Sequence, residues 1–205
     1  MSKSMTWTQV KKELKNHSTT DLLDLIKELH AANDLNKVFL STRLNLGTTM
    51  GSKELESIKK KLKKALLPSP KRYFDYEEFA PDPKYTMAHK LIKDYEKTKD
   101  DLGILDLYLS YAEGATAYLI KYDYMPSRFI DSACGFLAKF EAVYQNNPMY
   151  YARYFKKRLE DLNEAPIFQS LPYFGECFQG YFVDLLDLTP PKVLDDFDRE
   201  ELACV

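Results

Sequence analysis

Histidine and carboxylate side chains at helical spacing are the first candidates for metal chemistry in this chain. Glu13, His17 and Asp21 stand four residues apart, which would place two carboxylates and an imidazole on one face of a continuous helix. Such donors could hold a zinc ion. Ser18 and Thr19, however, form a typical helix start, which would separate these residues across a loop. We therefore interpret them as polar surface residues, and the sequence predicts no metal site.

Cysteine is the second candidate, as a nucleophile. Cys177 lies between two glycines in GECFQG, but a reactive thiolate needs a nearby base such as histidine, and no histidine follows His89. The chain also lacks the G-x-S-x-G, P-loop and H-E-x-x-H patterns. We therefore expect no catalytic residue, no cofactor and no enzymatic activity. Three unpatterned cysteines favour free thiols in a reducing, cytoplasmic compartment.

A row of lysines in SIKKKLKKAL (residues 57–66) raises the question of polyanion binding. A helix turns by roughly 100° per residue, so the apolar residues of this segment form one narrow stripe and most lysines fall on the opposite side. The stripe consists of Leu55, Ile58, Leu62, Ala65 and Leu66. This pattern predicts an amphipathic helix whose stripe packs on the core and whose lysines stay in solvent. Glu56 precedes Lys60 by four residues, which favours an exposed ion pair.

The alternative reading of this row is weak, salt-dependent contact with nucleic acid or another polyanion. The candidate contacts are Lys59, Lys60, Lys61, Lys63, Lys64, Lys71 and Arg72. Two observations make it the less favoured reading. The row contains no arginine before Arg72, so base edges would be read poorly. The isoelectric point of about 6.0 is also far below the basic range of nucleic-acid-binding domains.

Aromatic and basic side chains alternate in YYARYFKKRL (residues 150–159). Aromatic rings beside cations can stack on nucleic-acid bases. The favoured interpretation is a helix that alternates between core and rim, and among functional options we prefer a protein interface, which is rich in tyrosine and arginine. The candidate contacts in this segment are Tyr150, Arg153, Tyr154 and Lys157.

The elements that must position these residues are helical almost throughout. Apolar residues recur at helical spacing, while sustained two-residue alternation and hairpin turn pairs are absent. The expected helical segments are 18–33, 34–47, 52–68, 83–99, 100–123, 126–147, 148–164, 171–188 and 191–205. We expect an all-α fold of about eight or nine helices, arranged as antiparallel hairpins in a bundle or a short superhelical array. Segment 100–123 is apolar on most sides and should be the buried central helix.

Small residues predict one specific helix pair. Gly114 and Ala115 lie about ten residues before the turn near residue 125, and Gly135 lies ten residues after it. In an antiparallel hairpin these positions would face each other and let the two backbones approach closely. Such packing would offset the roughly 1 kcal/mol that a glycine inside a helix costs.

Charge and proline content divide the chain. Residues 1–72 carry 15 basic and 7 acidic side chains, a net charge of +8, whereas residues 73–205 carry 14 and 24, a net charge of −10. Four prolines between residues 68 and 83 coincide with this switch. We expect a basic helical subdomain over residues 1–67, an extended connector over 68–83 and a larger aromatic-rich helical subdomain over 84–205.

One family resemblance lies in the first third of the chain. The run VKKELKNHSTTDLLDLIKELHAANDLNKVFLSTRLN, followed by KKKLKKALLP, resembles a bacterial all-helical family catalogued only as a domain of unknown function. The resemblance covers about residues 10 to 70 and involves helix-packing residues. It implies a small helical bacterial protein and carries no activity and no functional residue with it.

These observations favour a non-enzymatic helical protein that presents helix faces to another protein or to a second copy of itself. The absence of a long apolar run argues against a membrane partner. The interaction hypothesis predicts an exposed apolar or aromatic patch. The polyanion hypothesis instead predicts a basic face that continues from residues 53–64 onto Arg153, Lys157 or Arg158.

Overall fold

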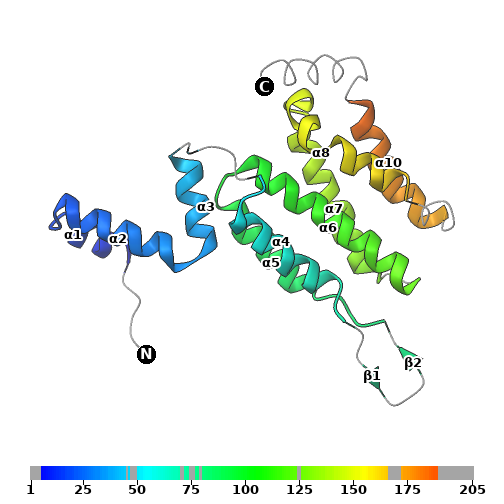
Figure 1. Cartoon of the computed structure of the whole chain (residues 1–205), viewed down its shortest axis with the longest axis horizontal. Helices are drawn as coiled ribbons and strands as arrows, with labels where there is room; N and C mark the ends of the chain where they lie inside the picture. Colours follow the sequence, from blue (N-terminus) through cyan, green and yellow to red (C-terminus); the bar gives the residue numbers. More distant parts are fainter. Residues whose placement is uncertain are drawn as a thin grey trace.

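The computed structural model describes residues 6–44, 46, 50–69, 72–73, 77–78, 80–123, 126–165 and 172–188, and in this part of the chain the fold is all-α, as predicted (Figure 1). The helices are α1 (Trp7–Leu14), α2 (Thr19–Ala32), α3 (Asp34–Arg43), α4 (Lys53–Leu66), α5 (Tyr85–Glu96), α6 (Asp101–Tyr122), α7 (Ser127–Tyr144), α8 (Pro148–Asn163) and α10 (Pro172–Asp187). Helix α1 was not predicted, and the segment 191–205 lies outside the described residues.

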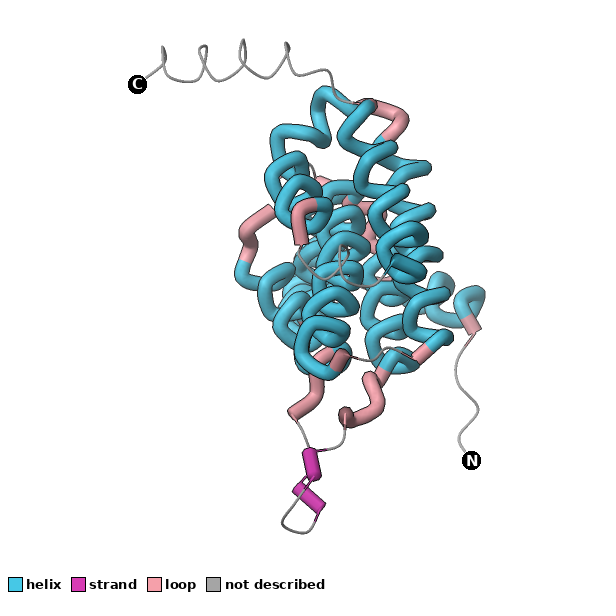
Figure 2. The backbone as a smooth tube through the Cα atoms, turned by 90° about the vertical axis from the view of Figure 1, so that its right-hand side faces the viewer, coloured by secondary structure: helices cyan, strands magenta, loops and turns pink. Residues whose placement is uncertain are grey.

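The proline-rich connector contains the one departure from the helical pattern among the described residues. Two-residue strands β1 (Arg72–Tyr73) and β2 (Glu77–Glu78) pair antiparallel, with Arg72 opposite Glu78. The small hairpin projects from one end of the helical body (Figure 2). The connector was predicted to be extended, and its two described pairs of residues form these short strands. Prolines that disfavour helix leave this segment in extended backbone, which is free to pair locally.

Helix pairs stack in chain order around α6. On one side α6 packs against α4 and α5, and on the other against α7 and α8, while α10 covers α7 and α8. Most residues of α6 are buried, including most of its apolar residues. The prediction of a buried central helix is confirmed, because a helix that is apolar on most sides is stable only when neighbours cover most of its surface. No described helix has both the length and the apolarity that a bilayer crossing requires.

Helix α4 is the amphipathic helix that the lysine row predicted. Ser52 caps its N-terminus by accepting a hydrogen bond from the Leu55 backbone N–H at 3.2 Å. The five residues of its apolar stripe are all buried. This stripe packs on α5 and α6, so α4 shares a hydrophobic core with the helices that follow residues 68–83. The subdomain boundary expected over these residues stays a prediction.

The α5–α6 turn is held by a buried hydrogen bond. The Tyr95 hydroxyl donates to the Asp100 carboxylate at 2.6 Å, and both residues are buried. Lys99 adopts a positive φ of 60°, which reverses the chain between the two helices. A Cβ atom on Gly103 would overlap both the Tyr95 hydroxyl and the Asp100 carboxylate. A side chain larger than glycine therefore does not fit at this position.

Helices α6 and α7 form the predicted hairpin, but their glycines do not face each other. A Cβ atom on Gly114 would lie 2.7 Å from Leu66 Cδ1, so this glycine admits α4 rather than α7. A Cβ atom on Gly135 would meet nothing within 4 Å. The predicted glycine pairing was wrong because the rotation of each helix about its axis, and not only its height above the turn, decides which neighbour a residue meets.

Helices α1 and α2 form an arm (residues 7–32) that projects from the stacked helices (Figure 1). Neither helix buries a side chain. The predicted cap of α2 is confirmed, since Ser18 and Asp21 form a capping box. Leu22, Leu25, Ile26 and Leu29 follow the spacing of a core-facing stripe, with Leu23 at its edge, but none of these residues is buried. The exposed fractions are 61% for Leu23, 41% for Leu25, 44% for Ile26 and 51% for Leu29.

Candidate functional site

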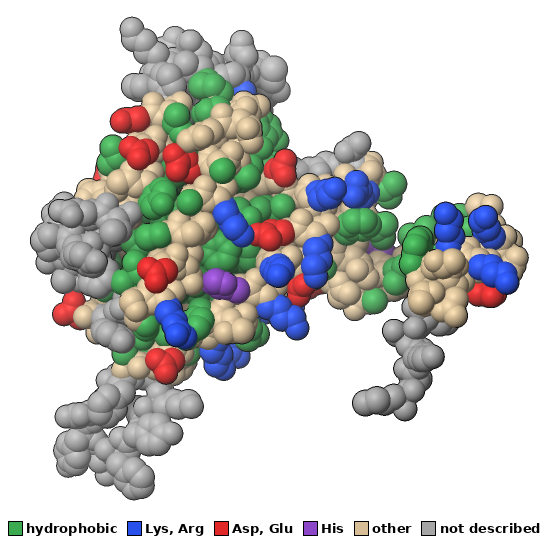
Figure 3. Space-filling model, turned by 180° about the vertical axis from the view of Figure 1, so that it is seen from behind, with side chains coloured by type: hydrophobic (Ala, Val, Ile, Leu, Met, Phe, Trp, Pro, Cys, Tyr) green, Lys and Arg blue, Asp and Glu red, His purple; other side chains and the backbone are tan. Residues whose placement is uncertain are grey.

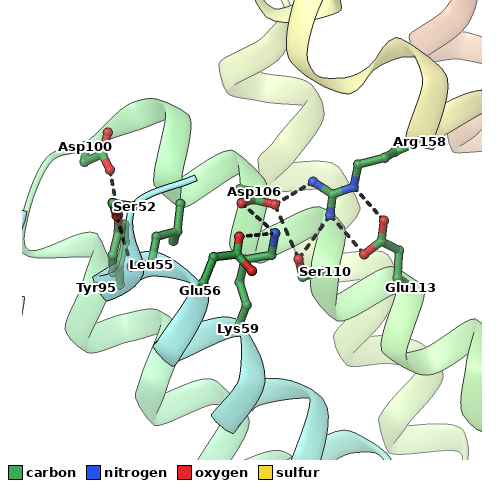
Figure 4. A network of polar contacts seen from close by, with 10 residues as sticks. All are labelled: Ser52, Leu55, Glu56, Lys59, Tyr95, Asp100, Asp106, Ser110, Glu113 and Arg158. Carbon is green, nitrogen blue, oxygen red and sulfur yellow. Dashed lines mark hydrogen bonds and ion pairs between the residues drawn. The ribbon is translucent and has the colours of Figure 1, made fainter. Parts of the chain in front are cut away.

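Three polar residues form a stripe along the otherwise apolar helix α6. Asp106, Ser110 and Glu113 follow at four- and three-residue spacing, so they share one face of the helix. This face lies between α4 and α8, and each of those helices contributes one cation to it (Figure 4). We call Lys59, Asp106, Ser110, Glu113 and Arg158 the charged junction.

Asp106 is the centre of the charged junction. Its side chain is 0% exposed, and each of its carboxylate oxygens lies near a different cation. Arg158 Nη1 from α8 donates to Oδ1 at 2.5 Å, and Lys59 Nζ from α4 lies 3.1 Å from Oδ2. A buried carboxylate without a partner would be strongly destabilising, so these two ion pairs fix the position of α6 between its neighbours.

Arg158 binds two carboxylates at once. Its Nε and Nη2 atoms donate to the two oxygens of Glu113, at 2.6 and 2.9 Å, which is the bidentate geometry of strong arginine pairs. Nη2 also donates to Ser110 Oγ at 3.1 Å. The planar guanidinium thereby spans two turns of α6, which a lysine ammonium could not do.

The junction keeps its cations charged. Burial acts to lower the pKa of Arg158, but hydrogen bonds and charge from Glu113 and Asp106 outweigh it and raise that pKa above its ordinary value. For Lys59, burial likewise acts downward, and the attraction of Asp106 together with hydrogen bonds to Glu56 and Asp106 raises the net pKa. Neither group is therefore prepared to release a proton near neutral pH, and both keep the charge with which they hold the carboxylates of α6.

A cavity of about 640 Å³ opens beside the junction, between α4 and α6. Its polar rim includes Lys60, Lys63 and Ser110, and its apolar floor includes Leu67, Gly114 and Ala117. Its volume is within the range of small-molecule sites in proteins.

From the sequence we expected the lysines of α4 to share one solvent-exposed face, whereas in the structure they lie in different environments. Lys59 is half-buried and belongs to the charged junction. It is therefore not available to a polyanion, although the sequence named it as a candidate contact. Glu56 binds Lys59 at 3.0 Å and not Lys60, which corrects the predicted pair. Lys60 and Lys63 border the α4–α6 cavity, and Lys61 and Lys64 are exposed elsewhere on α4. Lys71 and the side chain of Arg72 lie outside the described residues.

The aromatic–basic segment lies on α8 and divides between core and surface, as the favoured interpretation expected. Tyr150 is 39% exposed and its ring centre lies 5.6 Å from that of the half-buried Tyr154. Arg153 and Lys157 are exposed. Arg158 was expected to extend a basic face if the polyanion hypothesis held, but its guanidinium is bound by Asp106 and Glu113.

Histidines take no part in a metal site among the described residues, where no group of three histidine, cysteine or acidic side chains could hold an ion. Helix α1 ends at Leu14 and α2 begins at Thr19, so Glu13, His17 and Asp21 are separated as predicted. His89 contacts the rings of Tyr111 and Phe136 edge-on, at centroid distances of 5.8 and 5.0 Å. Cys177 lies in α10, and its side chain is outside the described part of the chain.

Sequence reasoning missed the α6 side of the junction, although its signal was readable. Asp106, Ser110 and Glu113 stand alone in an apolar helix at spacings that place them on one face. Lys59 was also distinct, because it lies only about 40° from Leu55 around α4 and so borders the apolar stripe. A lone charge on a buried face signals a partner from another element.

A comparison with family models, with curated proteins and with solved structures finds no match for this chain. The resemblance of residues 10–70 to a family of unknown function therefore stays a prediction.

Proposed function

We propose that this protein is a non-enzymatic interaction protein whose arm binds a second copy of the same chain. The observation that carries the proposal is the uncovered apolar stripe of α2. Leu23, Leu25, Ile26 and Leu29 together expose the equivalent of about two complete side chains. Trp7 on α1 adds a ring that is 70% exposed. Such a patch is typical of a protein-binding surface.

The free energy available from this stripe is sufficient only if both partners contribute. Fully burying one leucine or isoleucine gives about 1.5–3 kcal/mol, so two side-chain equivalents give about 3–6 kcal/mol per copy. Two copies that bury their stripes against each other double this gain.

The charges of the arm favour its own copy as the partner. Helix α1 and its C-cap carry three exposed lysines and one glutamate, Lys11, Lys12, Lys15 and Glu13. Helix α2 carries the opposite excess, with Asp21, Asp24 and Glu28 against Lys27. In a two-fold dimer the basic α1 of each copy can lie against the acidic α2 of the other, which satisfies both contacts at once. Figure 3 shows basic side chains beside hydrophobic ones on the arm, at the right of the view.

Sedimentation equilibrium of the full chain tests this proposal. We expect a dimer at about 100 µM, which requires only a modest affinity. Leu25→Ser combined with Ile26→Ser should give a monomer, because these side chains lie outside the core and keep 41% and 44% of their surface exposed within one copy. Ile120→Ser is the matched control, since it removes an apolar side chain that is 55% exposed on α6 and should leave the dimer intact. A monomeric wild-type chain, or a dimer that survives the double substitution, would refute the proposed partner.

Charge reversal tests the orientation of the two arms. Lys11→Glu with Lys12→Glu should weaken the dimer, and adding Asp24→Lys with Glu28→Lys in the same chain should restore it. If the four substitutions together dimerise no better than the first two, α1 does not lie against α2 of the other copy.

A further inference from the structure

We infer that the cavity between α4 and α6 is a binding site for an organic anion, with an oxyanion head held by Lys60 and Lys63 and an apolar body lying over Leu67, Gly114 and Ala117. The site is separate from the arm and does not depend on the proposed self-association. The polarity of its rim and the composition of its floor carry the inference.

The charged junction decides which groups of the rim are available to a ligand. Lys59 is already bound by Asp106 and Glu56, at 3.1 and 3.0 Å. Glu113 is already bound by two nitrogens of Arg158. These groups pair with one another before any ligand arrives, and because Lys59 and Arg158 face the three carboxylates Glu56, Asp106 and Glu113, they keep a net charge of −1. Glu56 also lines the cavity.

Lys60 and Lys63 are the remaining charges of the rim. Both are exposed, and neither forms an ion pair with a carboxylate in the described part of the chain. They stand three residues apart, so their ammonium groups leave the same side of α4. The rim thus offers two uncommitted positive charges, which suit the oxygens of a phosphate or a carboxylate.

The floor of the cavity explains why the ligand needs an apolar body. Gly114 and Ala117 are small residues three positions apart on α6, and both border the cavity beside the Leu66 side chain that packs on Gly114. Leu67, half-buried at the end of α4, closes the apolar side. A hydrated inorganic ion would leave this surface unused, whereas an alkyl or aryl group would cover it and gain the free energy of burial.

Lysines on the same helix provide an internal control. Lys61 and Lys64 have the same charge and are also exposed, but neither borders this cavity. Substituting either pair removes the same net charge from α4. A difference between the two pairs therefore reports position and not the overall charge of the helix.

Isothermal titration calorimetry with octyl phosphate tests the inference on the full chain. We expect saturable one-to-one binding that Lys60→Gln with Lys63→Gln weakens at least about tenfold, the effect of losing roughly one charge-assisted hydrogen bond. Lys61→Gln with Lys64→Gln should leave the affinity within about twofold of wild type. Ala117→Phe should abolish binding by filling the floor, and circular dichroism checks that each variant is folded.

Three further probes separate the parts of the ligand. Octanoate should bind if any oxyanion head group is sufficient. If octyl phosphate binds and octanoate does not, the site is specific for a phosphate head group. Inorganic phosphate without an alkyl chain, and octanol without a charge, should both bind at least tenfold more weakly than octyl phosphate. Equal loss of affinity in both lysine pairs, no loss in either, or no binding of octyl phosphate and octanoate would each overturn the inference.

Discussion

Removing the charge of Asp106 while keeping its shape should be among the most destabilising conservative changes in this protein. Asp106→Asn leaves Lys59 and Arg158 beside a neutral carboxamide in a site where the aspartate was 0% exposed. Breaking a buried ion pair on one side costs about 3–5 kcal/mol. Both cations are partly exposed, at 25% and 23%, and Arg158 keeps Glu113. We therefore expect a loss near the lower end, about 3 kcal/mol.

Urea unfolding followed by circular dichroism measures this loss as a shift of the midpoint at constant slope. Glu113→Gln is the matched comparison, because its side chain is 37% exposed and solvent can replace part of the lost pairing. It should cost only about 1 kcal/mol. If Asp106→Asn lowers the free energy of unfolding more than Glu113→Gln does, the burial of the carboxylate decides the cost. The two residues both pair with Arg158, so the ion pair alone would not explain the difference.

A double-mutant cycle then tests the physical reason. Adding Lys59→Met to Asp106→Asn removes a cation that has lost its buried partner and keeps only the exposed Glu56. The double variant should therefore be more stable than the sum of the two single changes predicts, by about 1–3 kcal/mol. Two results would refute this account of the junction: a cost below about 0.5 kcal/mol for Asp106→Asn, or strict additivity in the cycle. Either would mean that the carboxylate does not hold α4 and α8 to α6.

The glycines and His89 give three further predictions. Gly103→Ala should destabilise the fold by about 1–3 kcal/mol, because its methyl group overlaps the Tyr95 hydroxyl; thermal unfolding measures this, and an unchanged midpoint would show that the turn relaxes freely. Gly114→Ala should destabilise while Gly135→Ala should stabilise by about 0.5–1 kcal/mol in the same assay, and shifts of the same sign would contradict the two environments. Burial, and then the charge of Lys139, lower the pKa of His89 below that of the unfolded chain, so protonation favours unfolding. Stability should fall as the pH drops below about 6.5. Urea midpoints at several pH values should show a weaker decline in His89→Gln, and parallel pH curves would exclude this contribution.

The helices themselves could be predicted because their signals are local. Ser18 and Ser52 cap the N-termini that the sequence assigned to them, and the apolar stripe of α4 is buried as its spacing required. The same reasoning failed for α2, whose stripe has similar spacing but stays exposed. Periodicity shows that a face is apolar, but which surface covers that face depends on the rest of the fold or on a second molecule.

Only the α6 side of the charged junction could have been predicted from the sequence, for a related reason. Asp106, Ser110 and Glu113 lie within two turns of one helix, so their spacing alone places them together. Arg158 comes from a helix 52 residues further along the chain, and its direction depends on how α8 crosses α6. Helical spacing places Arg158 on the face of α8 that carries Tyr151 and Phe155, and Lys157 on the exposed side. The local pattern does not tell which carboxylates the guanidinium meets.

The position of each lysine around α4 decides its role, and this makes the functions of the helix separable. Lys59 lies beside the apolar stripe and forms an ion pair with Asp106. This ion pair holds α4, one wall of the cavity, against α6. Lys60 and Lys63 border the cavity, whereas no residue of the arm lines it. The arm comes near α4 elsewhere, where Ala31 and Ala32 border a second cavity with Lys61. Substitutions on the arm therefore leave the wall unchanged. Leu25→Ser with Ile26→Ser should accordingly abolish the dimer and keep octyl phosphate binding within about twofold, since sites without shared contacts contribute additively. Loss of both together would show that the cavity is completed by the second copy.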